Sequence, residues 1–105
     1  MKILEFKPLC EPEVKEIEGS LKSMQNEVDG YIQAVYPFDD EIALICNEEG
    51  KLIGLPLNRA LYDEKGNIMD VIAGTFFICG APNDEDSFKS IPDELIDKYT
   101  EHFWC

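Results

Sequence analysis

The residue with the clearest chemical potential is Arg59, the single arginine in a chain of 22 acidic and 9 basic residues. It follows Asn58 in the segment 57–61. A guanidinium offers a fork of donors that suits phosphate or carboxylate, so Arg59 with Asn58 could bind an anion or a partner protein. The structural alternative is an ion pair with one of the many carboxylates, which would hold segment 55–61 to a sheet.

The other reactive residue types form no recognisable catalytic set. Gly50 and Gly54 are not a phosphate loop, because Leu55 and Pro56 follow instead of the Gly-Lys-[Ser/Thr] ending. His102, the single histidine, lies near the end of a predicted helix, where positive charge is favoured. We therefore expect a protein that is not an enzyme and has no catalytic residue.

Metal and cofactor sites are not indicated either. The four cysteines, Cys10, Cys46, Cys79 and Cys105, lie far apart and form no C-x-x-C pair. Cys46 and Cys79 lie in apolar runs, which favours reduced cysteines in the core. The acidic run 83–86 begins no EF-hand loop, because the required glycine is missing at the sixth position. We expect no metal and no cofactor.

Length and composition predict one globular domain, residues 1–105, with 45% hydrophobic and 30% charged residues. The net charge of −13 argues against direct nucleic-acid binding and against adsorption to anionic membranes. The first residues show no signal-peptide pattern and no segment approaches the roughly 20 apolar residues of a membrane span, so we expect a cytoplasmic protein.

The acidic charge leaves three interpretations open: solubility alone, attraction of a basic protein partner, or imitation of DNA. DNA imitation would need carboxylates gathered on one face. The candidates are Glu11, Glu13, Glu16 and Glu18, together with Asp39, Asp40 and Glu41.

Apolar and β-branched runs predict strands at residues 3–6, 14–17, 31–36, 42–46, 51–54, 68–72 and 75–79. Segment 55–61 is predicted to be irregular, with a single helical turn, because Pro56 and Asn58 disfavour a strand. Gly50 is expected to turn a hairpin with a positive φ, and Gly74 to bend the chain between two strands.

Two adjacent aromatic residues, Phe76 and Phe77, must face opposite sides of a strand. Two arrangements satisfy this pattern. Either both faces of the sheet are covered, or one phenylalanine is an exposed contact residue.

Two amphipathic helices are predicted. Ser20 is a suitable N-cap for the first, near 20–29, and Gly30 is expected to end it in a left-handed conformation. Ser90 and Asp93 resemble a capping box at the start of the second, near 91–103. Its apolar stripe consists of Ile91, Leu95, Tyr99 and Phe103. The prevalence of hairpin loops predicts an α+β domain, a mainly antiparallel sheet with both helices packed on one face.

Residues 46–61 and 70–78, with 13–19 and 30–32, resemble domain-of-unknown-function family number 3846 over most of residues 2–80. The resemblance implies an accessory protein of phages, plasmids or conjugative elements of Gram-positive bacteria. It points to Asn58, Arg59 and the Gly74-Thr75 bend without attaching an activity to them.

We predict a protein-interaction module. Its partner is an unidentified protein, and a basic protein is one candidate. An alternative is a binder of a small anionic ligand or nucleotide, with contacts from Arg59 and from backbone amides near Gly74-Thr75. The candidate binding residues are Asn58, Arg59, Gly74, Thr75 and Phe76.

Overall fold

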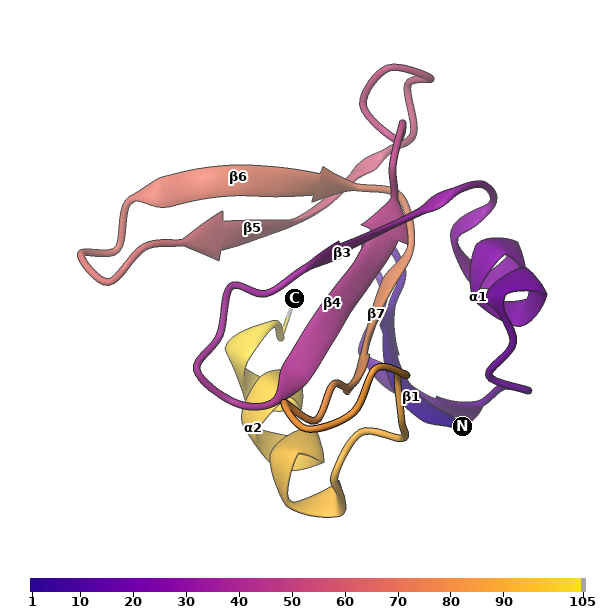
Figure 1. Cartoon of the computed structure of the whole chain (residues 1–105). Coiled ribbons are helices and arrows are strands. Elements are labelled where there is room, and N and C mark those ends of the chain that lie inside the picture. The colour runs from indigo at the N-terminus through magenta and orange to yellow at the C-terminus, as the bar shows by residue number, and fades with distance from the viewer. Residues whose placement is uncertain (105) are drawn as a thin grey trace.

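The central feature is an antiparallel sheet of five strands in the order β2-β1-β7-β4-β3, seen in a computed structural model that describes residues 1–104 (Figure 1). These strands are β1 (Lys2–Phe6), β2 (Glu13–Glu16), β3 (Ile32–Val35), β4 (Ile42–Asn47) and β7 (Phe76–Gly80). A separate hairpin consists of β5 (Leu57–Tyr62) and β6 (Ile68–Ala73). The helices are α1 (Leu21–Val28) and α2 (Asp93–His102), and the α+β class is as predicted.

Strands β4 and β7 form the middle of the core, and every residue in both is buried. Their continuous apolar runs require cover on both sides of the sheet. Phe76 packs in the cluster on one face and Phe77 in the cluster on the other. Both phenylalanines are fully buried, so the arrangement with two covered faces is the one adopted.

The two helices lie on opposite faces of the sheet, not on one face as the sequence suggested. Met24 and Val28 of α1 pack with Phe77 on one face. Tyr99 and Phe103, in and directly after α2, pack in the cluster on the other face, which the hairpin also covers. The reason is the two-sided core, because helices on a single face would leave one set of apolar side chains in water.

The hairpin of β5 and β6 extends away from the body of the molecule (Figure 1). Leu61 and Ile72 anchor its base in the core. The prediction that segment 55–61 is irregular was wrong, since β5 begins directly after Pro56. Asn58 does not interrupt the strand, because the register shifts between Leu57 and Ala60 and accommodates it as a bulge.

The strand predicted at 51–54 is also wrong, because residues 48–54 form consecutive turns. Leu55 N–H donates to the Gly50 carbonyl at 2.9 Å, and Leu52 remains 86% exposed. The positive φ in this segment, +75°, belongs to Gly54 and not to Gly50. Gly50 lacks a side chain for another reason, since a Cβ there would lie 2.7 Å from the Ala73 carbonyl oxygen.

Helix α1 begins as predicted, with Ser20 Oγ accepting from Ser23 N–H at 3.1 Å. The left-handed residue at its end is Asp29, with φ 60°, and not Gly30. Gly30 instead allows close approach, because a Cβ there would lie 2.8 Å from Asn47 Nδ2.

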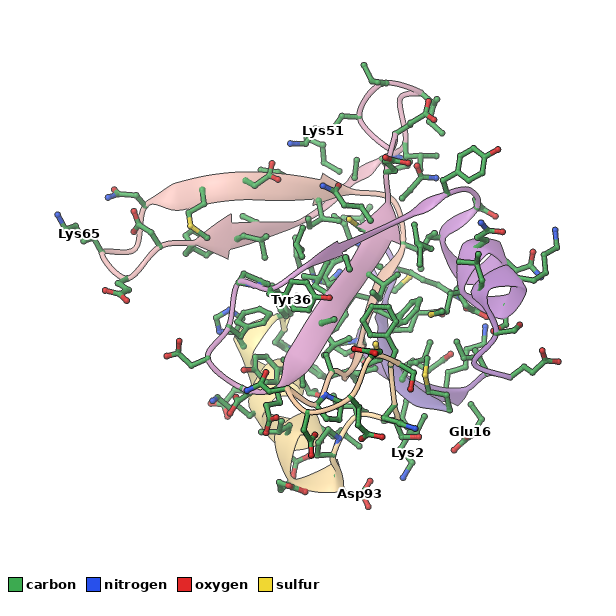
Figure 2. All side chains as sticks on the ribbon, in the orientation of Figure 1. Lys2, Glu16, Tyr36, Lys51, Lys65 and Asp93 are labelled. Atoms are coloured by element: carbon green, nitrogen blue, oxygen red, sulfur yellow. The ribbon has the colours of Figure 1, made fainter. Side chains whose placement is uncertain are left out.

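Helix α2 begins after Pro92 with no side-chain cap, so the predicted capping box is wrong. Ser90 Oγ instead accepts from Lys2 N–H at 2.9 Å, and Asp93 pairs with Lys2 Nζ at 2.9 Å (Figure 2). Of the predicted apolar stripe, Leu95 is half-buried, and the remaining three are buried: Ile91, Tyr99 and Phe103.

The cysteine predictions agree with the structure over the described residues. Cys46 and Cys79 are buried free thiols that pack on opposite faces of the sheet. Burial raises the pKa of Cys79 to about 12. Cys10 is free and exposed, and Cys105 lies outside the described residues. No helix within residues 1–104 has the length and apolarity needed to cross a membrane.

Candidate functional site

Arg59 lies in the middle of β5 with its side chain turned inward, and only 8% of its surface is exposed. Its Nε donates to the Phe103 carbonyl at 2.9 Å. Nη1 donates to the Lys7 carbonyl at 2.9 Å, and Nη2 to the Cys10 carbonyl at 2.6 Å. One side chain thus joins the hairpin to the β1–β2 connection and to the end of α2.

Asn58 extends this arrangement to two further carbonyls. Its Nδ2 donates to Phe6 O at 2.8 Å and to Gly74 O at 2.9 Å. Its Oδ1 accepts from Arg59 Nη1 at 2.8 Å. We call this pair of side chains, with the carbonyls it binds, the Asn58–Arg59 clamp.

The clamp departs from the ion pair that the sequence suggested for Arg59. Within residues 1–104 the hydrogen-bond partners of the guanidinium are three backbone carbonyls and one amide oxygen. The Phe103 carbonyl is bound in a buried position, and the Lys7 and Cys10 carbonyls in partly buried ones. Such carbonyls outside helices and strands need donors, and a guanidinium supplies five N–H groups in fixed directions. The aromatic ring of Phe6, whose centroid lies 5.7 Å from the guanidinium carbon, contributes a cation–π contact.

The turn that the clamp holds presents Leu9 in an unusual way. Leu9 has a φ of 61°, the left-handed region, which costs a leucine roughly 1–2 kcal/mol. Its side chain is 96% exposed and therefore recovers nothing by burial. Cys10 N–H donates to Lys7 O at 3.1 Å and closes the turn whose carbonyls Arg59 binds.

A pocket of about 330 Å³ lies beside this turn, with Leu9 and Arg59 in its lining. Tyr62 from the hairpin and Trp104 after α2 also line it, and both are more than half exposed. We call Leu9, Tyr62 and Trp104 the Leu9 surface. The exposed His102 lies on the same pocket and packs edge-on against the buried Phe103 ring at 4.6 Å.

The apolar surface continues along the hairpin. Ile68 is the cross-strand partner of Tyr62, and both Ile68 and the next residue, Met69, are more than half exposed. The turn beyond them carries Asp63, Glu64 and Lys65, the last of which projects at the far end of the hairpin (Figure 2). The hairpin therefore offers apolar side chains with a charged tip.

The predicted site residues are brought together only in part. Asn58, Arg59 and Gly74 are connected through the clamp, and Gly74 bends the chain between β6 and β7 as predicted, with a positive φ of 84°. Thr75 is half-buried in the bend. Phe76 is fully buried, with its ring stacked on Phe6 at 4.8 Å, so it supports the site from beneath.

The sequence analysis missed Leu9, Tyr62 and Trp104. An exposed leucine in a left-handed conformation has no sequence pattern that identifies it. The three residues come from positions 9, 62 and 104, so only the fold places them together.

The two acidic groups proposed from the sequence as candidates for imitation of DNA lie at opposite edges of the sheet. Residues 11–18 contain β2, and residues 39–41 connect β3 to β4, while β2 and β3 are the two outer strands. Both groups also have positive neighbours. Glu16 lies 3.4 Å from the Met1 amine, and Asp40 pairs with Lys98 Nζ at 2.7 Å.

The fold and the clamp define a small α+β protein in which a buried arginine joins three distant segments to one another. The chain belongs to the family described as Domain of unknown function (DUF3846), whose sequence model matches residues 1–104. The family resemblance noted in the sequence is thereby confirmed. No curated protein and no solved structure matches the chain at a significant level.

Proposed function

We propose that this protein is a non-enzymatic interaction module of a mobile genetic element, which binds a protein partner through the Leu9 surface. The observation that carries the proposal is Leu9, an almost fully exposed leucine in a left-handed backbone conformation. The mobile-element context comes from the resemblance of the sequence, and the interaction surface comes from the geometry.

The energetics of Leu9 support a role in binding. The side chain adds nothing to the stability of the isolated chain, while its backbone conformation costs free energy. A glycine at this position would remove that strain. Burial of the leucine side chain in a complex would add a favourable contact that the isolated fold does not make.

The Leu9 surface suits a partner with one protruding apolar side chain. The adjoining pocket of about 330 Å³ has the size of a small binding cleft, and the rings of Tyr62 and Trp104 border it. Tyrosine and tryptophan are the residues most often found at the energetic centre of protein interfaces.

The charge of the chain adds a second property to the partner. A net charge of −13 attracts positively charged surfaces. Asp63 and Glu64 directly follow Tyr62 in the sequence, and the exposed Glu101 precedes His102. We therefore propose a basic protein whose apolar anchor enters the pocket while its lysines or arginines pair with carboxylates of this chain.

Binding of a small anion by Arg59 is a weaker candidate. Arg59 lines the pocket, but four of the five N–H groups of its guanidinium already donate within the chain. One N–H group remains for a ligand, which is less than the two-pronged contact that makes arginine selective for phosphate or carboxylate.

A displayed library of random peptides tests the proposal. The immobilised wild-type protein should enrich peptides with an aromatic or aliphatic residue flanked by lysine or arginine, and raised salt should weaken their binding. Leu9→Ser should reduce affinity for the enriched peptides by at least tenfold. Leu52→Ser, which alters a leucine of similar exposure on the 48–54 turn, is the matched control and should bind like wild type.

Two outcomes would contradict the proposal. One is a library that yields no sequence enriched over blank support. The other is a set of enriched peptides that bind Leu9→Ser as tightly as they bind the wild-type protein. Enrichment of acidic peptides that depend on Arg59 would favour anion binding instead.

A further inference from the structure

Glu5 is a buried acidic side chain in the middle of β1. It lies between Leu4 and Phe6, which face the α2 side of the sheet, so Glu5 faces the α1 side. It is 1% exposed, and neither carboxyl oxygen has a hydrogen-bond donor among residues 1–104. A buried ionised carboxylate without donors is costly, which makes this side chain unusual.

Charged groups from every neighbouring element surround Glu5. Helix α1 contributes Glu27, and β2 contributes Lys15 together with Glu13, the cross-strand partner of Glu5. Lys7 follows β1, and on the other side β7 offers only the apolar Phe77.

The two lysines compensate Glu5 only weakly. Lys7 Nζ lies 3.8 Å and Lys15 Nζ 4.0 Å from Glu5 Oε1, both beyond hydrogen-bond range. Lys15 is instead bonded to Glu27 Oε2 at 2.9 Å. The ammonium group of Lys15, which could otherwise pair with Glu5, is therefore hydrogen-bonded to Glu27.

The remaining way to satisfy Glu5 is a proton. Burial is the largest cause that raises the pKa of Glu5 to about 7, the neighbouring Glu27 carboxyl adds to the rise, and Lys15 and Lys7 oppose it. The pKa of Glu27 is lowered, with Glu5 as the largest cause and Lys15 as a further one. Glu5 therefore holds the proton, while Glu27 stays ionised and pairs with Lys15.

We propose that Glu5 keeps a proton beside the ionised Glu27, that this pair of carboxyl groups fastens α1 and β2 to the sheet, and that loss of the proton loosens both elements. The pair spans the sheet and α1, and Lys15 links it to β2. The proposal is independent of the Leu9 surface, which lies on other elements.

The direction of the pH dependence follows from the Glu5 pKa. Because this pKa is raised above its ordinary value of 4.5, the stabilisation is fully present in acid below that value. It is lost as the pH rises through about 7. Between pH 5.5 and 8.5, Glu5 alone should increase the unfolding equilibrium constant by about 30-fold.

Denaturant unfolding of wild type and Glu5→Gln at the two pH values measures this effect. Glutamine keeps the shape and the neutrality of the protonated acid, so the variant should lose the 30-fold change. Every other titratable group is the same in both proteins and cancels in the difference. An equal pH dependence in the two proteins would overturn the proposal.

Carbon-13 NMR of the Glu5 carboxyl tests the pair in the wild-type protein without any substitution. We expect a midpoint near pH 7 and increased amide hydrogen exchange in α1 above it, with no matching change in the β5–β6 hairpin. Glu27→Gln should move the Glu5 midpoint toward acid, because it removes a negative neighbour. A wild-type midpoint below pH 5, or one unmoved in Glu27→Gln, would exclude a proton held by Glu5 beside Glu27.

Discussion

Arg59 fixes the backbone on both sides of Leu9, although the two residues lie fifty positions apart in the sequence. Its terminal nitrogens donate to the carbonyls of Lys7 and Cys10, which enclose the turn at whose tip Leu9 lies. The buried cation and the exposed leucine therefore belong to one structural unit. A substitution at either residue should affect the other in a predictable way.

Removing the guanidinium should destabilise the fold. Arg59→Ala leaves the carbonyls of Lys7, Cys10 and Phe103 without their side-chain donor, and we expect a loss of about 2–4 kcal/mol in the free energy of unfolding. Arg59→Lys should lose less, because an ammonium group can replace some of these bonds but cannot reproduce the fork. Chemical denaturation monitored at Trp104 measures both, and variants that unfold like wild type would refute a structural clamp.

Leu9→Gly should stabilise the isolated protein while it weakens binding at the Leu9 surface. Relief of the left-handed conformation, less the greater flexibility of unfolded glycine, gives a gain of about 0.5–1 kcal/mol. Leu52→Gly is the control, because Leu52 is also highly exposed but lacks a positive φ. Thermal unfolding should therefore shift upward for Leu9→Gly and downward for Leu52→Gly, and shifts of the same sign would contradict the strain at Leu9.

Two glycines of the 48–54 turn should respond differently to alanine. Gly50→Ala places a Cβ 2.7 Å from the Ala73 carbonyl oxygen, so the backbone must move, at a cost of about 2–3 kcal/mol. Gly54 has open space around it but a φ of +75°, and Gly54→Ala should cost about 1 kcal/mol. Urea titrations of both variants check the order of these costs, and a larger loss for Gly54→Ala would mean that conformation matters more than contact.

The apolar residues in and directly before α2 should contribute unevenly to the free energy of unfolding. Ile91 is 2% exposed, and Ile91→Ala should cost about 2–5 kcal/mol, the usual range for a buried aliphatic side chain. Leu95 is half-buried, so Leu95→Ala should cost about 1–2 kcal/mol, roughly half the loss at a buried site. Equal losses in the two variants would show that the packing of α2 differs from that described.

Local sequence patterns correctly predicted the elements whose conformation follows from their own side chains. The apolar run at 42–46 became the buried β4, and Ser20 capped α1. The patterns failed where tertiary contacts decided the conformation. Leu52 and Ile53 looked like part of a strand, yet both are exposed on a turn, and Pro56 and Asn58 suggested a break where β5 begins with a bulge.

Part of the candidate site could be predicted from the sequence. Arg59 was notable because no other arginine exists in the chain, and its structural role could be proposed from the surplus of carboxylates. Its partners in the structure include three backbone carbonyls. Because every residue has a backbone carbonyl, the sequence does not show which of them will accept from Arg59. Leu9 was missed for a related reason, since its importance lies in a backbone angle and not in its side chain.

The β5–β6 hairpin pairs with itself and shares no strand ladder with the main sheet within residues 1–104. Its attachment therefore depends on the packing of Leu61 and Ile72 and on the Asn58–Arg59 clamp. If the hairpin detaches, the 7–10 turn and the end of α2 lose their anchor in the same event. Segments from the beginning, middle and end of the chain thus form a single cooperative opening unit, whose amide protons exchange together although the sequence separates them.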